Sequence, residues 1–392
     1  MMNRLRAGEA LPDDRDQAVL VGRAWRPDRG GPSIVTLRGG QVLDITSRKA
    51  PTSAALFALA DPAGWAREAE GEAIGAIDEL LANSDEAARD PARPWLLSPV
   101  DLQAVKASGV TFVVSLLERV IEEQARGAPE KAVQIRADLD RLIGTDLAAL
   151  RPGSEEAMAV KEALIARGIW SQYLEVGIGP DAEIFTKSQP MSTVGTGAHI
   201  GIHPNSVWNN PEPEIVLVVS GDGRIAGATL GNDVNLRDFE GRSALLLGKA
   251  KDNNASCSLG PFVRLFDAGF TLDDVRQARL DLKVEGDDGF VLHGMSSMTE
   301  ISRDPEELVH AAMGENHQYP DGFILMLGTM FAPVEDRGAP GEGFTHKLGD
   351  VVTISARRLG ALQNRVMHCA DCAPWDFGAS ALMRNLAARG LL

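Results

Sequence analysis

The chain has 392 residues, 44% of them hydrophobic and 24% charged, which is enough for an ordinary core in two domains or in one large domain with an appendage. Its net charge of −16 argues against a nucleic-acid partner, which would need a clustered basic surface. No stretch approaches the roughly 18 uninterrupted apolar residues of a membrane span, so we expect no membrane partner. Three cysteines are too few for a disulfide framework, and no apolar run follows the N-terminus, so we expect a reduced, cytoplasmic protein.

The first 95 residues are predicted to form a small N-terminal α/β domain. Strand and turn chemistry predicts a short meander at 18–25, 33–38 and 41–45. Apolar residues at helical spacing predict helices at 52–60 and 65–82. Ala92-Arg93-Pro94 marks the boundary, and residues 96–392 are expected to form the second, larger domain.

The larger domain divides again by composition. Residues 96–168 are expected to be mainly helical, with helices within 109–126 and 132–150 and a third that starts at Ser154 as its N-cap. From Gly168 onward, strands, glycines and short turns dominate. This part is interrupted by a helix near 304–313, has its last expected strand at 351–355 and closes with a short helix at 376–390. Together the elements predict an α+β fold.

Three carboxylates are expected to meet at one end of a hairpin. Glu212 and Glu214 are spaced i, i+2, so both lie on one face at the start of a strand. The turn Ser220-Gly221-Asp222-Gly223 returns the chain and brings Asp233 beside them. Such carboxylates repel one another unless a cation is present, and all-oxygen ligation suits Mg²⁺, Mn²⁺ or Ca²⁺. The alternative is a set of solvated carboxylates at a strand end, each with a local ion pair.

The segments around these carboxylates resemble the core signature of the fumarylacetoacetate hydrolase family. They are Pro-Glu-Pro-Glu-Ile-Val-Leu-Val-Val at 211–219, Gly-Asn-Asp-Val-Asn-Leu-Arg-Asp at 231–238, Lys251 ahead of Gly260-Pro261, Gly343-Phe344, and 348–354. The resemblance implies a mixed β-roll core at 169–392 with a helical lid region at 96–168. It also implies a Mg²⁺ ion, replaceable by Mn²⁺, on Glu212, Glu214 and Asp233, and a substrate that carries a 2-oxo acid.

The lid pattern of the family, Gly-x-Asn-Tyr-x-x-His-x-x-Glu, resembles residues 109–118, with Ser115 in place of the histidine and Glu118 as the glutamate. In hydrolytic members that histidine and glutamate activate water to break a carbon–carbon bond. Neutral serine cannot act as a base near neutral pH, so the substitution argues against hydrolysis. The departure is expected of the family's sugar-acid dehydratases, which the segments 106–112 and 250–257 also resemble.

This resemblance implies a Mg²⁺-dependent hydro-lyase that converts a 2-keto-3-deoxy pentonate, derived from xylonate or arabinonate, to 2,5-dioxopentanoate in non-phosphorylative pentose catabolism. Lys251 would steady the developing enolate charge, and Glu183 or Glu118 would be the general base. Thr329 and Ser188 are expected near the substrate carboxylate, and Ser115 is expected to bind the substrate as well. The plain alternatives are a structural salt bridge for Lys251 and surface positions for the two glutamates.

Two other functions stay open at this point. One is a hydrolase that cleaves a carbon–carbon bond of a diketo acid, and Ser115 counts against it. The other is a non-catalytic binding protein for 2-oxo acids, against which Lys251 and Glu118 count. The expected partner is a small-molecule 2-oxo sugar acid, and a homodimer or larger homo-oligomer is implied by the resemblance alone. The lone pair Cys369-Ala-Asp-Cys372 lacks the second ligand pair of a zinc site.

Overall fold

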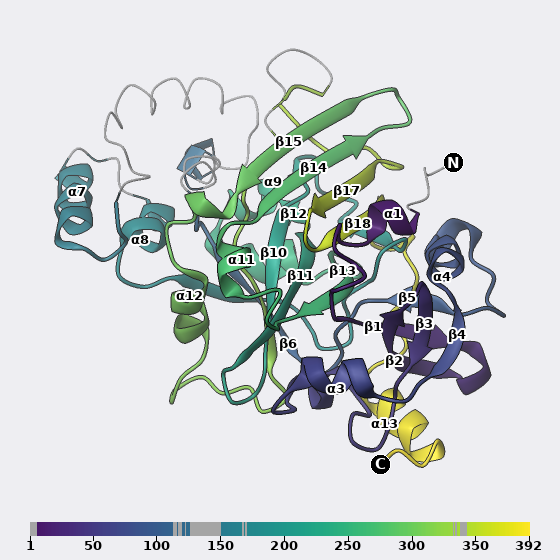
Figure 1. The fold of residues 1–392 in the computed structure, drawn as a ribbon. Helices are drawn as coiled ribbons and strands as arrows, with labels where there is room; N and C mark the ends of the chain where they lie inside the picture. Colours follow the sequence, from purple (N-terminus) through teal and green to yellow (C-terminus); the bar gives the residue numbers. More distant parts are fainter. Residues whose placement is uncertain are drawn as a thin grey trace.

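The computed structural model describes residues 6–112, 116, 120–121, 123–125, 150–166, 168, 171–331, 333, 335–337 and 343–392. Two mixed sheets form its centre, and helices lie around them (Figure 1). The predicted α+β fold class is therefore confirmed. No described helix is both long and apolar enough to cross a membrane.

The described strands are β1 (Leu20–Arg26), β2 (Gly31–Arg38), β3 (Gln41–Asp44), β4 (Glu72–Ala76), β5 (Trp95–Leu97), β6 (Ala104–Gly109), β7 (Glu183–Ser188), β8 (His199–Ile202), β9 (Asn209–Asn210), β10 (Pro213–Val219), β11 (Ile225–Asp233), β12 (Asn235–Leu236), β13 (Cys257–Leu265), β14 (Arg279–Glu285), β15 (Val291–Ser297), β16 (Phe323–Met326), β17 (Val351–Ala356) and β18 (Gly360–His368).

The helices that lie wholly within the described residues are α1 (Ala7–Ala10), α2 (Ser53–Phe57), α3 (Pro62–Glu68), α4 (Ile77–Ser84), α7 (Glu155–Ala166), α8 (Gln172–Ile178), α9 (Arg237–Glu240), α10 (Leu247–Lys251), α11 (Leu272–Arg276), α12 (Pro305–Ala312) and α13 (Ala379–Ala388). Short 3-10 turns lie at η1 (Pro27–Arg29), η2 (Glu86–Ala88), η4 (Ala244–Leu246) and η5 (Met298–Glu300).

The larger sheet has 11 strands in the order β4-β3-β2-β1-β13-β11-β10-β16-β6-β7, with β5 paired to β1. A second sheet of 5 strands runs β15-β14-β17-β18-β8, and β9 pairs with β12. Most neighbours are antiparallel, whereas β16 with β6 and β18 with β8 are parallel. The sheets are therefore mixed, as the resemblance implied.

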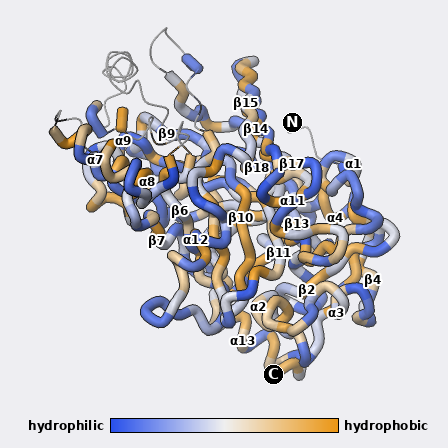
Figure 2. The backbone as a smooth tube through the Cα atoms, turned by 60° about the vertical axis from the view of Figure 1, so that its left-hand side comes forward, coloured by the Kyte–Doolittle hydropathy of each residue, from blue (hydrophilic) through white to orange (hydrophobic). Residues whose placement is uncertain are grey.

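The central strand β10 buries both of its faces, as its unbroken apolar run suggests. Ile215, Leu217 and Val219 pack in a core cluster shared with the 5-stranded sheet. Val216 and Val218 pack on the opposite face, in a cluster with residues of β1, β6 and α2. Figure 2 shows this hydrophobic strand running through the middle of the molecule. The strand is therefore a rigid support for whatever its first residues carry.

The predictions for the N-terminal region are partly confirmed. β1, β2 and β3 occupy the three predicted strand positions, and α2 lies within 52–60. The predicted helix at 65–82 is wrong, because β4 separates α3 from α4 and pairs with β3. Gly75 has φ of 145°, which an α-helix does not accommodate. The boundary at residue 95 stays a prediction, and β1 pairs with both β5 and β13 within one sheet.

Residues 96–168 are less helical than expected over their described part. The prediction is wrong for β6, which pairs with β16 and β7 in the large sheet. Only its long-range partners define this strand, since Val105 is its one β-branched residue. The helix expected from Ser154 is confirmed as α7, and the Ser154 Oγ accepts a hydrogen bond from the Ala157 amide (3.2 Å). Residues 132–149 lie outside the described residues.

The C-terminal third also differs at two points from the prediction. β18 follows β17, so the strand at 351–355 is not the last one. Polar residues such as Gln363 and Asn364 lie in β18 and hid its strand pattern. The helix α8 lies just after Gly168, where strands were expected. α12 and α13 confirm the two helices predicted near 304–313 and 376–390.

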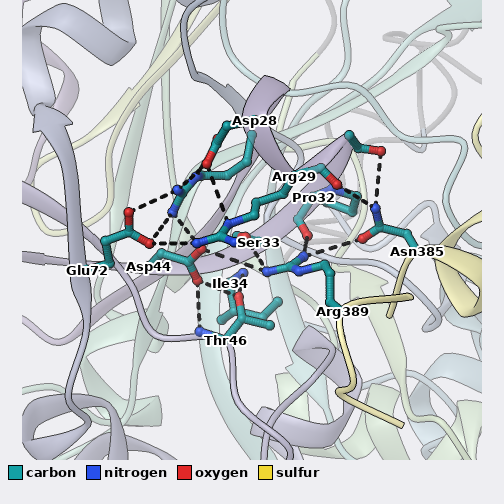
Figure 3. Close-up of polar contacts among 12 residues, drawn as sticks. Asp28, Arg29, Pro32, Ser33, Ile34, Asp44, Thr46, Glu72, Asn385 and Arg389 are labelled. Carbon is teal, nitrogen blue, oxygen red and sulfur yellow. Dashed lines mark hydrogen bonds and ion pairs between the residues drawn. The ribbon is translucent and has the colours of Figure 1, made fainter. Parts of the chain in front are cut away.

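Six charged side chains join the two ends of the chain, and we call them the terminal clasp: Arg26, Asp28, Arg29, Asp44, Glu72 and Arg389 (Figure 3). The Arg26 guanidinium donates to Asp28 (2.6 Å), Asp44 (3.0 Å) and Glu72 (3.0 Å). Arg389, just after α13, donates to the carbonyl oxygen of Pro32 (2.9 Å). The clasp therefore fastens the C-terminal helix to the N-terminal strands (Figure 3).

Candidate active site

A buried cluster of three carboxylates, here called the acidic centre, lies where β10 begins and β11 ends. Glu212, Glu214 and Asp233 each offer one oxygen atom, and these atoms all lie within 4.8 Å of one another. Each residue is 1% exposed. Antiparallel pairing sets Glu214 opposite Gly231, and the Asp233 amide donates to the Glu212 carbonyl oxygen (3.0 Å). The predicted convergence of the three side chains is confirmed.

Backbone and hydroxyl donors orient the Glu214 carboxylate. The Gly328 amide donates to its Oε2 atom (2.7 Å), and the Thr329 hydroxyl lies 3.5 Å from its Oε1 atom. Gly328 has φ of 100°, and a Cβ there would lie 1.9 Å from the Thr111 Oγ1 atom. Glycine is therefore required for this amide to approach the glutamate. The segment after β16 thus contributes to the site from far along the chain.

Burial and charge affect the three carboxylates differently. Burial raises the pKa of Glu214 well above its ordinary value, and the charges of Asp233 and Glu212 raise it further. Burial also acts to raise the pKa of Asp233, but the ammonium groups of Lys187 and Lys251 outweigh it and lower that pKa. Asp233 is therefore held ionised, whereas ionisation of Glu214 is opposed.

Two buried lysines contact the acidic centre. Lys251, the last residue of α10, places its Nζ atom 2.7 Å from the Glu212 Oε2 atom and 3.1 Å from the Asp233 Oδ2 atom. Glu240 lies 3.6 Å from the same ammonium. Lys187, at the end of β7, approaches the other Asp233 oxygen, Oδ1, at 2.8 Å. Among the described residues, four buried carboxylates thus surround two ammonium groups.

A pocket with a volume of about 140 Å³ opens beside the acidic centre. Residues of β6, β7, α8, α9 and α10 line it, and they include Tyr173, Glu183, Phe185, Glu212, Asp233, Glu240, Lys251 and Thr329. Gly109 and Glu183 are direct partners across β6 and β7. A Cβ on Gly109 would lie 1.8 Å from the Glu183 Oε2 atom, so the bare glycine leaves room for that carboxylate.

The structure brings most of the predicted site residues together. Glu183, Lys251 and Thr329 line the pocket with two of the three expected metal ligands. Ser188 is 3% exposed, its hydroxyl contacts that of Ser192, and it is not among the pocket-lining residues. Ser115 and Glu118 lie outside the described residues.

The sequence interpretation missed Lys187 and Glu240. Spacing alone does not point to Lys187, because it lies at a shift in the pairing register of β6 and β7, where the alternation of strand faces is interrupted. Glu240 lies in the short helix α9, and no pattern of spacing connects it to the hairpin.

The cysteines Cys257, Cys369 and Cys372 are all free thiols. Glu212, Glu214 and Asp233 are the only potential three-ligand metal cluster among the described residues.

Comparison with known proteins places this site in a family. Residues 174–367 match the family described as fumarylacetoacetate (FAA) hydrolase C-terminal. One curated relative, a probable 2-keto-3-deoxyxylonate dehydratase from Haloferax volcanii, is 30% identical over 194 residues, which are 50% of this chain and 63% of the relative. Another, a 2-dehydro-3-deoxy-D-arabinonate dehydratase from Saccharolobus solfataricus, is 31% identical over 183 residues, which are 46% of this chain and 57% of the relative.

The chain thus spans less than two thirds of the length of these two relatives. A solved structure described as 2-keto-3-deoxy-D-arabinonate dehydratase complexed with magnesium and 2,5-dioxopentanoate has a TM-score of 0.59 and 21% sequence identity. The superposition covers 89% of this chain and 99% of that chain, and it shows a common fold. Residues 174–367 of this chain therefore match the fumarylacetoacetate (FAA) hydrolase C-terminal family.

Proposed function

We propose that this protein is a Mg²⁺-dependent hydro-lyase that dehydrates a 2-keto-3-deoxy pentonate to 2,5-dioxopentanoate. The observation that carries the proposal is the buried acidic centre beside a pocket that also presents Lys251 and Glu183. The two curated relatives, both described as dehydratases of 2-keto-3-deoxy sugar acids, support the choice of substrate class.

The residues of the acidic centre fit a hard divalent cation. Their donor atoms are all carboxylate oxygens, which Mg²⁺ prefers over the nitrogen and sulfur ligands typical of zinc. With every group ionised, the four carboxylates and two ammonium groups of the described site leave a net charge of two negative units, which one divalent ion would balance. We assign the ion to Glu212, Glu214 and Asp233.

The metal would act as a Lewis acid toward the 2-oxo and carboxylate oxygens of the substrate, which acidifies the protons on its carbon 3. Lys251 lines the pocket with a buried positive charge, so it stabilises the enolate oxygen where negative charge develops. Thr329, which also lines the pocket, would donate to the substrate carboxylate.

Glu183 takes the carbon-3 proton as the general base and returns it to the departing carbon-4 hydroxyl. That proton and that hydroxyl leave as one water. The unsaturated product then moves one proton from carbon 5 to carbon 3, which gives an enol. The hydroxyl proton of that enol moves from the oxygen on carbon 5 to carbon 4, which gives the semialdehyde, so the atoms balance over the whole reaction. Glu183 faces the pocket from β7, and Gly109 leaves it the space to do so.

The test compares two substrates with the same purified protein. With Mg²⁺ and a 2-keto-3-deoxy pentonate, we expect 2,5-dioxopentanoate, which an NADP-linked aldehyde dehydrogenase oxidises in a coupled assay. With a diketo acid, we expect no carbon–carbon cleavage. Release of pyruvate from the diketo acid, with no semialdehyde from the sugar acid, would replace the dehydratase by a hydrolase. Binding of either acid without turnover would indicate the non-catalytic binding protein.

A homodimer or larger assembly and a cytoplasmic location are further parts of the proposal. The oligomer is implied by the family resemblance, and light scattering coupled to gel filtration measures it directly. The location agrees with three free thiols, and fractionation of the source cells would test it. A monomer in solution would remove the first of these statements without affecting the proposed chemistry.

A further inference from the structure

Lys187 is a buried lysine beside the pocket that does not line it. We propose that Lys187 is a positioning residue, which holds the Asp233 carboxylate through an ion pair at its Oδ1 atom while Lys251 donates a hydrogen bond to Oδ2. It acts through Asp233 and through the backbone of Lys251. The inference rests on the proposed function only for the use of a metal at the acidic centre.

The contacts of Lys187 account for its ammonium group. Its side chain is 0% exposed, and its Nζ atom lies 2.8 Å from the Asp233 Oδ1 atom. The same ammonium donates to the carbonyl oxygens of Lys251 (2.9 Å) and Val234 (3.2 Å), and it lies 3.4 Å from the Ser256 hydroxyl. An ammonium has three protons to donate, so these acceptors can satisfy it without water. Asp233 provides the opposite charge that a buried ammonium requires.

Asp233 is thus held between two ammonium groups, one on each oxygen. Lys251 lines the pocket and contacts the Asp233 Oδ2 atom at 3.1 Å. Lys187 does not line the pocket and contacts the Oδ1 atom at 2.8 Å. A metal ion held at the acidic centre would therefore meet an Asp233 carboxylate fixed by two ammonium groups, through the hydrogen bond from Lys251 to Oδ2 and the ion pair of Lys187 with Oδ1. Lys187 also binds the last carbonyl oxygen of α10, so one ammonium fixes both the ligand and the main chain of the pocket lysine.

The strand β7 explains why a single residue can do this. Glu183 and Phe185 are spaced i, i+2, so they share one face of the strand. Lys187 follows at a shift in the pairing register of β6 and β7. Glu183 and Phe185 line the pocket, and the Phe185 ring lies 5.5 Å from the Lys251 Nζ atom. Farther along the strand, Lys187 reaches the Asp233 carboxylate of the acidic centre. By anchoring the end of β7, it keeps Glu183 and Phe185 in register with Lys251.

A purely electrostatic role and a positioning role of Lys187 predict opposite changes in cation affinity when the lysine is removed, so an affinity measurement can distinguish them. If Lys187 were only a positive neighbour, its loss would tighten the binding of a cation. If it positions Asp233, its loss weakens binding, since partners that orient metal ligands typically contribute about 10- to 100-fold in affinity. The sign of the change in Mn²⁺ affinity therefore separates the two roles.

The experiment measures Mn²⁺ binding by electron paramagnetic resonance in Lys187→Met, Lys187→Arg and the matched control Lys283→Met. Lys283 is also a strand lysine paired with one carboxylate (Glu285, 2.7 Å), but it is 41% exposed and outside the site. We expect Mn²⁺ to bind about tenfold more weakly, with an altered spectrum, in both Lys187 variants, and no change in the control. Circular dichroism checks that each variant folds. Unchanged or tighter Mn²⁺ binding in the folded Lys187 variants overturns the proposal.

A measurement on the unmodified protein decides the matter if neither Lys187 variant folds. With ¹⁵N-labelled lysine, the ammonium resonance of Lys187 is expected to stay protected from exchange with water whether or not Mg²⁺ is added. Loss of that protection on addition of Mg²⁺ would show that Lys187 leaves Asp233, and the role would be abandoned. None of these readouts needs turnover, so a failed dehydration assay would reject the proposed function and leave this inference standing.

Discussion

The terminal clasp and the acidic centre are both clusters of charged side chains, but they balance their charges differently. The clasp opposes three guanidinium groups to three carboxylates, and two of its acids, Asp28 and Glu72, keep 55% and 56% of their side chains exposed. In the acidic centre, Glu212, Glu214 and Asp233 are all buried. The charges of the clasp thus balance within the protein, whereas the buried acidic centre, with every group ionised, has an excess of negative charge that a divalent cation would balance.

The difference separates a charge cluster that stabilises the fold from one that is available for chemistry. Arg26 satisfies its guanidinium with hydrogen bonds to three acids, and these bonds raise its pKa further. Glu214 instead has its pKa raised by burial and by like charges. Unfavourable burial of like charges is retained in proteins mainly where a site uses it. Four substitutions or conditions test this contrast, and their expected effects decrease in the order given.

The largest effect is expected from Glu214→Gln in the acidic centre. The substitution keeps an oxygen to accept from the Gly328 amide but removes a metal ligand. We expect loss of Mg²⁺ binding and at least about a thousandfold lower kcat/KM, because Lewis-acid catalysis contributes several kcal/mol. Calorimetry and the coupled assay measure the two effects.

The metal-free Glu214→Gln protein should be no less stable than the unmodified protein, since one buried like charge is gone. Glu285→Gln, a change of a strand glutamate that is 37% exposed, serves as the control. Activity that survives Glu214→Gln would remove Glu214 from the metal site.

A smaller effect is expected from Gly109→Ala, which disturbs the pocket wall and leaves the acidic centre intact. The new methyl group would meet the Glu183 carboxylate, which must move. A displacement of about 1 Å can lower the rate about a hundredfold, so kcat should fall by that order while Mg²⁺ affinity is kept. Gly314→Ala is the control, because a Cβ there has no neighbour within 4 Å. Unchanged kcat would argue that Glu183 is not the base.

Arg26→Met should affect stability and leave the chemistry unchanged. Removing one partner of a buried ion pair costs about 3–5 kcal/mol, and we reduce this to about 2–3 kcal/mol because two of the three acids stay in water. Urea denaturation measures the loss, and kcat below the melting range should not change. Arg29→Met, at a side chain that is 47% exposed, should cost less than about 0.5 kcal/mol. Equal losses of unfolding free energy in Arg26→Met and Arg29→Met would mean that the buried Arg26 contributes no more to stability than the exposed Arg29.

The smallest effect is expected from lowering the pH, which should reduce the stability of the protein. The hydrogen bonds from Arg26 lower the pKa of Asp28 below 3.8 and that of Glu72 below 4.5. A carboxyl group with a lowered pKa contributes stability above its unfolded value and loses that contribution as the pH falls through its folded value. The stability of the unmodified protein should therefore decline as the pH falls below about 4.5. In Arg26→Met this part of the decline should be shallower, and parallel curves for the two proteins would contradict the assignment.

Sequence patterns located the acidic centre because its geometry is local. Glu212 and Glu214 share a face by the period of a strand, and the Ser220–Gly223 turn returns the chain to Asp233. The family resemblance added Lys251, Glu183 and Thr329, which the structure places around one pocket. Ser188 is buried against Ser192 and is not among the residues that line the pocket. A hydroxyl residue in the sequence does not by itself indicate which face of a strand it occupies.

By itself the sequence determined the α+β class, the hairpin of β10 and β11 and the meeting of three carboxylates, since strand period and turn chemistry act over short stretches of chain. Tertiary structure decided that 72–76 and 104–109 are strands, because their pairing partners lie elsewhere in the sheet. It also decided that Lys187 and Glu240 join the site. A buried charge is defined by its distant partners, and their identity appears only when the strands are assembled.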